Sequence, residues 1–180
     1  MGDFGHFDLL PVVGGFGPPP TERQTTFDVA ASTFAPHRFA TKLPKDQTSL
    51  ELTATERCAM IELTFAPDTA GHAGLVLQTG LGEAPTLSEV RIDQAQGHIE
   101  GVSRASHGGS PPGFGCWLVI QIDNPSLAEA YPFTPEQPLH HRAQLEHARP
   151  GVYLRFVGAG RFTLRIATSF ISLDQARINL

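Results

Sequence analysis

The stretch Ser49–Phe65, SLELTATERCAMIELTF, constrains the fold more than any other part of the chain. Apolar and polar residues alternate along it with a period of two, which places one row of each kind on opposite faces of a β-strand. The phase of this alternation changes at Glu56 and Arg57, and such a change predicts a bulge or a bend from one sheet to another. The apolar row consists of Leu50, Leu52, Ala54, Ala59, Ile61, Leu63 and Phe65.

The rest of the chain predicts about ten strands separated by turns and little helix, which is typical of a β-sandwich. The 18 glycines and 15 prolines suit a sheet protein with many turns. We expect 116–123 to be a central strand, because it is apolar on both faces near its start. We also expect a short helix near 142–147 and a hairpin of 152–157 with 161–168. The other predicted strands are 4–13, 25–30, 37–43, 73–79, 87–93 and 96–105.

The end of the chain has a different pattern. Ser172 and Gln175 form a capping box, and Leu173, Ala176 and Leu180 repeat at helical spacing. A helix of two turns is marginal alone, so we expect it to continue in a longer polypeptide. The predicted fold is therefore all-β, a large antiparallel β-sandwich over residues 1–171, followed by the start of a helix over residues 172–180.

Composition excludes several classes of partner. The net charge is −5 with only 13 Lys and Arg and no basic cluster, which argues against nucleic acid. No apolar run approaches the roughly 20 residues that span a bilayer, and the N-terminus lacks the pattern of a signal peptide. Cys58 and Cys116 both lie in predicted strands, where two buried thiols and a single disulfide remain alternatives.

No catalytic motif of high specificity is present. The cluster His140, His141, Glu146 and His147 has no spacing typical of a metal site, and we interpret it as a solvated loop. Glu51 and Glu56 are expected to face solvent. Trp117 and Phe114, beside a Gly/Pro loop, suit either a sugar-stacking platform or the core.

The best candidates for a binding site lie at the N-terminus. Asp3, Gly5 and His6 belong to the glycine-flanked segment GDFGHFD, and glycine lets a ligand or another backbone approach closely. We therefore take Asp3 and His6 as candidates for a site, against the alternative of a frayed terminus.

Several motifs together resemble the N-terminal domain of glycoside hydrolase family 92, calcium-dependent exo-acting α-mannosidases. LTATER at Leu52–Arg57 and SFISLDQARINL at Ser169–Leu180 are the most specific of them. GDFGHFDLLPVVG at Gly2–Gly14 is similar to a Gly-Asp-x-Gly strand of that family, and SEVRID at Ser88–Asp93 stands between them in the expected order. The resemblance extends over the whole chain. It implies that Asp3, Gly5 and His6 bind substrate, because they follow the active-site loop of that family.

The resemblance implies a galactose-mutarotase-like supersandwich that packs on an (α/α)6 catalytic domain, with a mannose-containing glycan bound where the two meet. It implies calcium in the full-length enzyme and none bound by this chain alone. The catalytic carboxylates would lie on the barrel, outside this sequence, so we expect no catalytic residue here and no hydrolysis by the isolated chain. Export to the periplasm or the medium is implied by the family only. A stand-alone carbohydrate-binding module and a purely structural interaction domain are the alternatives.

Overall fold

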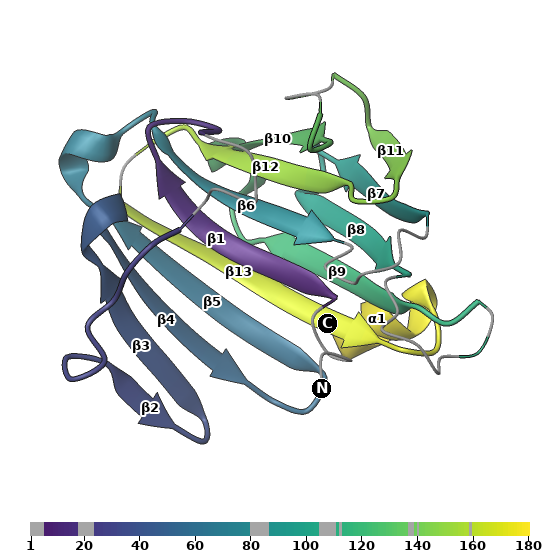
Figure 1. Ribbon diagram of the computed structural model, residues 1–180, viewed down its shortest axis with the longest axis horizontal. Helices are drawn as coiled ribbons and strands as arrows, with labels where there is room; N and C mark the ends of the chain where they lie inside the picture. The colour runs from purple at the N-terminus through teal and green to yellow at the C-terminus, as the bar shows by residue number, and fades with distance from the viewer. Residues whose placement is uncertain are drawn as a thin grey trace.

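The part of the protein that the structure describes is a two-layer sandwich of antiparallel sheets with one short α-helix, as a computed structural model shows (Figure 1). The structure describes residues 6–17, 24–79, 87–104, 111, 113–136, 139, 141–158 and 160–180. The strands and helices are β1 (Phe7–Val13), β2 (Thr33–Ala35), β3 (Arg38–Leu43), η2 (Pro44–Asp46), β4 (Thr48–Ala54), β5 (Cys58–Phe65), η3 (Pro67–Thr69), β6 (Ala73–Thr79), β7 (Ser88–Asp93), β8 (His98–Ser103), β9 (Cys116–Ile122), η4 (Pro125–Leu127), β10 (Ala128–Phe133), β11 (Gln144–His147), β12 (Gly151–Phe156), β13 (Gly160–Ser169) and α1 (Leu173–Asn179).

The two sheets differ greatly in width. Within the described residues, the small sheet has the order β1-β6-β12-β10 and the large sheet has the order β11-β7-β8-β9-β13-β5-β4-β3-β2. In Figure 1 the small sheet lies in front of the large one, and β2, β3 and β4 extend past the edge strand β1. The all-β sandwich predicted from the sequence is confirmed.

The core lies between the inner faces of the two sheets. Alternating residues of the large sheet, such as Ile61, Leu63 and Leu164, meet Leu75 and Leu154 of the small sheet, and all are buried. The rings of Phe156 and Phe162 stack across the layers with centroids 4.0 Å apart. Burial of this apolar surface is the main force that holds the layers together.

Ser49–Phe65 forms a hairpin within one sheet. β4 and β5 pair antiparallel, with Leu50 opposite Leu63 and Leu52 opposite Ile61. The predicted apolar row does face inward, but the expectation of a bulge or a bend between two sheets is wrong. Glu56 and Arg57 occupy a tight exposed turn, which lets the same alternation continue on the returning strand.

Three further predictions are wrong. Residues 25–30 form no strand, and residues 142–147 contain the strand β11 in place of a helix, since pairing with β7 overrides local propensity. The segments 152–157 and 161–168 are strands but make no hairpin. β12 pairs with β6 and β10 in the small sheet, whereas β13 pairs with β5 and β9 in the large one.

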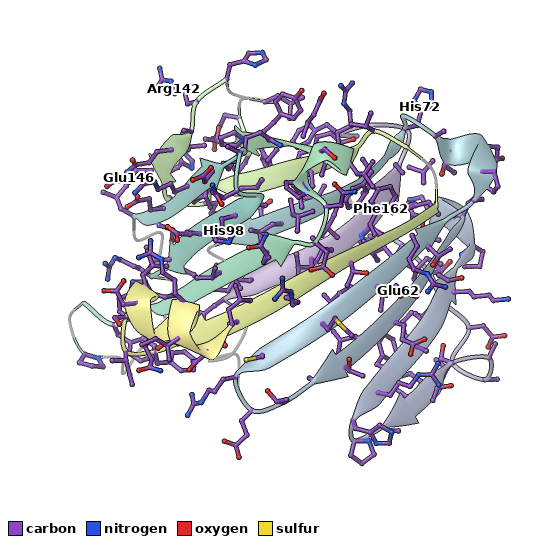
Figure 2. The ribbon with its side chains drawn as sticks, turned by 180° about the vertical axis from the view of Figure 1, so that it is seen from behind. Glu62, His72, His98, Arg142, Glu146 and Phe162 are labelled. Atoms are coloured by element: carbon purple, nitrogen blue, oxygen red, sulfur yellow. The ribbon has the colours of Figure 1, made fainter. Side chains whose placement is uncertain are left out.

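Helix α1 lies over the outer face of the large sheet, as Figure 2 shows. The Ser172 half of the predicted capping box is present, because the Ser172 hydroxyl accepts a hydrogen bond from the Gln175 backbone N–H at 3.1 Å. The Gln175 side chain instead donates to the Asn179 side chain at 2.9 Å. Ala176 is fully buried, and the Asn179 amide donates to the Thr168 carbonyl at 2.9 Å. The helix therefore packs on the sandwich.

A second apolar cluster covers the outer face of the small sheet. Phe133, Tyr153 and Val76 are buried there, and the Phe16 ring meets the Phe133 ring edge-on at 4.7 Å. Val12 joins this cluster, whereas Phe7 and Leu9 pack on the main core. The Phe16 ring thus shields part of the outer face of the small sheet, which would otherwise meet water.

Both cysteines are free thiols. Strand β13 lies between β5, which carries Cys58, and β9, which carries Cys116. This arrangement separates the two thiols and excludes the disulfide left open by the sequence. Burial raises the pKa of the Cys116 thiol to about 11.

Candidate functional site

His6 lies at the start of β1 and is only 5 % exposed. Its Nδ1 lies 3.4 Å from the hydroxyl oxygen of Ser103, which is itself fully buried at the end of β8. His6 directly precedes β1, and β1 begins at the end of the sandwich nearest to α1 (Figure 1). A buried imidazole beside a hydroxyl is a positioned polar group within an otherwise apolar environment.

Two phenylalanine rings enclose His6. The Phe170 ring meets the imidazole nearly edge-on with centroids 5.8 Å apart, and the Phe114 ring lies 6.2 Å away. The two phenylalanine rings stack on each other at 5.5 Å and 14°. Phe170 is still 38 % exposed, so one aromatic face of this group reaches the surface. We call His6, Ser103, Phe114 and Phe170 the His6 cluster.

Of the three residues predicted to bind substrate, the structure describes only His6. Asp3 and Gly5 lie outside the described residues, and His6 is buried by the aromatic rings. Their role in binding stays a prediction. Phe114 belongs to the His6 cluster, whereas Trp117 points to the outer face of β9, where the Arg104 guanidinium lies 6.0 Å from its ring. The structure therefore does not bring Phe114 and Trp117 together as one stacking platform.

A polar hollow of about 230 Å³ lies between α1 and the outer face of β7 and β8. The Arg177 guanidinium donates to the Glu100 carboxylate at 2.7 Å and to Asp174 at 2.8 Å, which raises the Arg177 pKa. His98, labelled in Figure 2, lies opposite Asp93 in the strand register. The hollow is lined by Arg91, Asp93, His98, Glu100 and Arg177.

A second polar group joins β10 and β12. The Tyr131 hydroxyl donates to Glu129 at 2.6 Å, and Arg155 donates to the same carboxylate at 3.0 Å. The hydroxyl of Tyr131 and the guanidinium of Arg155 lower the Glu129 pKa, and the carboxylate raises the Tyr131 pKa. A carboxyl group held ionised in this way is unsuited to act as a general acid.

The histidine cluster near residue 140 forms no metal site among the described residues. His147 Nε2 lies 3.5 Å from Glu136, His141 packs edge-on against Tyr131, and His140 lies outside the described residues. In the described part of the chain, no group of three or more His, Cys, Asp and Glu side chains is arranged to hold a metal ion. The described residues therefore do not fit calcium.

Sequence reasoning missed the polar hollow, although part of its signal was available. Alternation in 88–93 and 98–101 already placed Arg91, Asp93, His98 and Glu100 on one face of a hairpin. His98 follows Gly97, and a glycine of this kind is more typical of a turn than of a strand start. The position of Arg177 over that face depends on where α1 packs, which no local pattern gives.

The chain was compared with known proteins. The family model for the glycosyl hydrolase family 92 N-terminal domain matches residues 1–169. Comparison with curated protein sequences gave no match.

Solved structures show where the fold recurs. An inverting mannosidase of family GH92 from Bacteroides thetaiotaomicron superposes with a TM-score of 0.82 at 24 % identity, covering 96 % of this chain and 23 % of that one. A GH92 α-mannosidase from the same organism gives 0.81 at 18 % identity, covering 98 % and 26 %. A structure of that α-mannosidase in complex with mannoimidazole gives 0.79 at 17 %, covering 98 % and 25 %. The chain thus spans about a quarter of the length of the structures that it matches.

Proposed function

We propose a function from one premise: this chain belongs to the family of glycosyl hydrolase family 92 N-terminal domains. It serves as the accessory domain of an α-mannosidase-like glycoside hydrolase, where it supports the catalytic domain and helps to shape the sugar site. The observation that carries this proposal is coverage, because the sandwich accounts for nearly all of this chain and about a quarter of a GH92 inverting mannosidase.

The side chains of the sandwich bear on which domain of the enzyme supplies the catalytic acid and base. The described carboxylates of Glu51, Glu129 and Glu100 are each engaged by an arginine, as cross-strand and helix–sheet ion pairs. Inverting hydrolysis needs an acid and a base with a water between them. We assign the acid, the base and calcium to a catalytic domain outside residues 1–171, and a mannose-containing glycan as the substrate of the whole enzyme.

The His6 cluster is the part of the chain that we assign to the sugar site. It combines a polar imidazole with the partly exposed ring of Phe170, and an exposed aromatic face is suited to pack on the apolar face of a sugar ring. Asp3 and Gly5 precede it in sequence and are assigned to the same site.

The test uses the complete product of the gene and an aryl α-mannoside. We expect hydrolysis by the complete product, none by the 180-residue chain, and a fall in kcat/KM of at least tenfold in Phe170→Ala. Val157→Ala, an exposed apolar residue of another loop, serves as the control and should keep full activity. Failure of the complete product to cleave α-mannosides would contradict the proposal.

Calorimetric titration of the 180-residue chain with mannose and mannobiose distinguishes the two alternative functions, a carbohydrate-binding module and a structural interaction domain. Saturable binding by this chain alone would identify a stand-alone carbohydrate-binding module. Absence of sugar binding by this chain, together with absence of hydrolysis by the complete product, would indicate a purely structural interaction domain.

A further inference from the structure

The inner face of the large sheet has an apolar end that water reaches. Phe34 and Phe39 stand opposite each other in β2 and β3, and their row continues through Leu52 of β4 to Ile61 of β5. Ile61 is buried in the core, but Phe34 is 61 % exposed. The row thus emerges from the core where β2, β3 and β4 extend past β1 (Figure 1).

Three aromatic rings gather on this surface. The Phe34 and Phe39 ring centroids lie 5.1 Å apart, and the Phe27 ring meets Phe39 edge-on at 6.3 Å. Phe27 is 44 % exposed, and Val29 beside it is 64 % exposed. We call Phe27, Phe34 and Phe39 the phenylalanine patch. Contiguous exposed apolar groups of this kind mark interaction sites.

The other face of the same strands has the opposite character. Arg38 pairs with Glu51 across β3 and β4 at 2.7 Å, and Arg161 pairs with Glu62 across β13 and β5 at 3.3 Å. Such exposed cross-strand ion pairs are typical of a solvated sheet surface. The overhanging strands are therefore amphipathic, and the apolar side is the one that needs a cover.

The chemistry of the patch favours a polypeptide over a glycan. A sugar requires hydrogen-bonding groups beside the aromatic rings, yet the nearby Ser32 and Thr41 hydroxyls bond to each other at 2.7 Å, and Ser32 also donates to the Asp28 carbonyl at 2.6 Å. Strand β2 is only three residues long, which offers little edge for pairing with a second copy. The solved GH92 enzymes are about four times longer than this sandwich, so most of such a chain lies outside it.

We propose that the phenylalanine patch is the surface on which the remainder of the hydrolase polypeptide packs, through an apolar face of that remainder. This inference rests on the proposed function, because it takes the partner to be the rest of the same enzyme. It adds the place of contact, the inner face of β2–β4, and the residues that make it.

Hydroxyl-radical footprinting with mass spectrometry tests the contact. The 180-residue chain is compared with the complete gene product, and labelling of Phe34 and Phe27 is measured against Val157, an apolar residue that is 51 % exposed on another loop. We expect labelling of Phe34 to fall at least fivefold in the complete product while Val157 is unchanged. In Phe27→Ser/Phe34→Ser, labelling of Phe39 in the complete product should rise, whereas Val157→Ser should leave it unchanged.

Several outcomes would overturn the inference. They are equal labelling of Phe34 in both proteins, protection that depends on the concentration of the 180-residue chain alone, protection by added mannobiose, or a gene that encodes nothing beyond residue 180. Hydrolysis of an α-mannoside, measured on the same complete product, separates the two proposals. If the complete product hydrolyses the α-mannoside but Phe34 is not protected from labelling, only the proposed docking surface is contradicted. If Phe34 is protected but the α-mannoside is not hydrolysed, only the proposed function is contradicted.

Discussion

Gly151, at the start of β12, lies where the ring of Phe133 crosses the strand. A Cβ at this position would meet Phe133 Cζ and lie 2.6 Å from the Leu77 carbonyl oxygen. The backbone carbonyl belongs to the neighbouring strand and cannot move away freely. Gly151 is therefore required by packing of the outer aromatic cluster, although its sequence context is that of an ordinary strand start.

We predict that Gly151→Ala destabilises the protein by about 2–3 kcal/mol, since overpacking forces ring and backbone apart. Thermal or urea unfolding of the 180-residue chain measures this change. Gly158→Ala is the matched control, because a Cβ there meets nothing within 4 Å, and its stability should stay within about 0.5 kcal/mol of wild type. Equal stability of both variants would show that the cluster repacks easily.

The buried thiol of Cys116 predicts a dependence of stability on pH. Its pKa is raised by burial from 9.0 to about 11, so the unfolded chain loses this proton at a lower pH than the folded one. The stabilising contribution is full below pH 9 and is lost as the pH rises through about 11, amounting to about 2 kcal/mol.

Comparison of wild type with Cys116→Ala isolates this effect from tyrosine and lysine titration. The gap in unfolding free energy between the two proteins should narrow between pH 9 and 11. A constant gap across that range would contradict the assignment.

Among the strands, β10 forms a free edge of the small sheet, and the Gln94 side chain protects it. The Gln94 amide donates to the Ala128 carbonyl at 2.7 Å and accepts from the Ala130 N–H at 2.8 Å. It thereby satisfies two backbone groups that a neighbouring strand would otherwise pair, which is one way to protect an edge from association.

Gln94→Ala should destabilise the protein by about 1–2 kcal/mol, because both backbone groups lose their partner. Hydrogen exchange of the Ala130 amide should speed up at least tenfold. Gln144→Ala removes a glutamine whose side-chain amide donates to the half-buried Glu89 carboxylate at 2.7 Å and to no backbone group of a described edge strand, and it should change neither quantity. Unchanged exchange at Ala130 would show that water replaces the side chain without cost.

The elements also show how far the sequence predicts the fold. Alternation in Ser49–Phe65 gave the inward row correctly, because one face of the large sheet packs on the core and the other meets water. It failed for the partner of 152–157, since a short glycine loop joins strands of one sheet or of two equally well. Burial of Val152, Tyr153 and Leu154 on both faces of β12, against the alternation of β13, reflects their different sheets.

For the candidate site, the sequence located His6 at the end of a strand but not its neighbours. Phe114 and Phe170 are far from it along the chain, and only the packing of the segments before β9 and after β13 against the start of β1 brings them together. The same limit applies to Arg177, which reaches Glu100 across 77 residues. Contacts between distant segments depend on tertiary packing that no local pattern contains.

At the scale of the whole molecule, the C-terminal boundary of the sandwich depends on whether helix α1 belongs to it. The sequence predicts a sandwich over residues 1–171 and a separate helix start over residues 172–180. In the structure, Val119 and Ala167 point to the outer face of the large sheet, which also carries the polar Gln121 and Arg165, yet they are 1 % and 0 % exposed. Helix α1 packs against the strands that carry them, β9 and β13.

We therefore predict that residues 172–180 stabilise the sandwich. Deletion of residues 172–180 would uncover Val119 and Ala167 and remove the bonds of Asn179 to Thr168 and of Arg177 to Glu100. The expected loss is about 2–4 kcal/mol, from lost apolar burial and lost hydrogen bonds. Deletion of Leu180 alone is the control and should cost less than about 1 kcal/mol. If the shorter chain unfolds at the same urea concentration as the 180-residue chain, the helix is only a linker, and the domain ends at residue 171. A loss of the expected size would extend the folded unit to include α1.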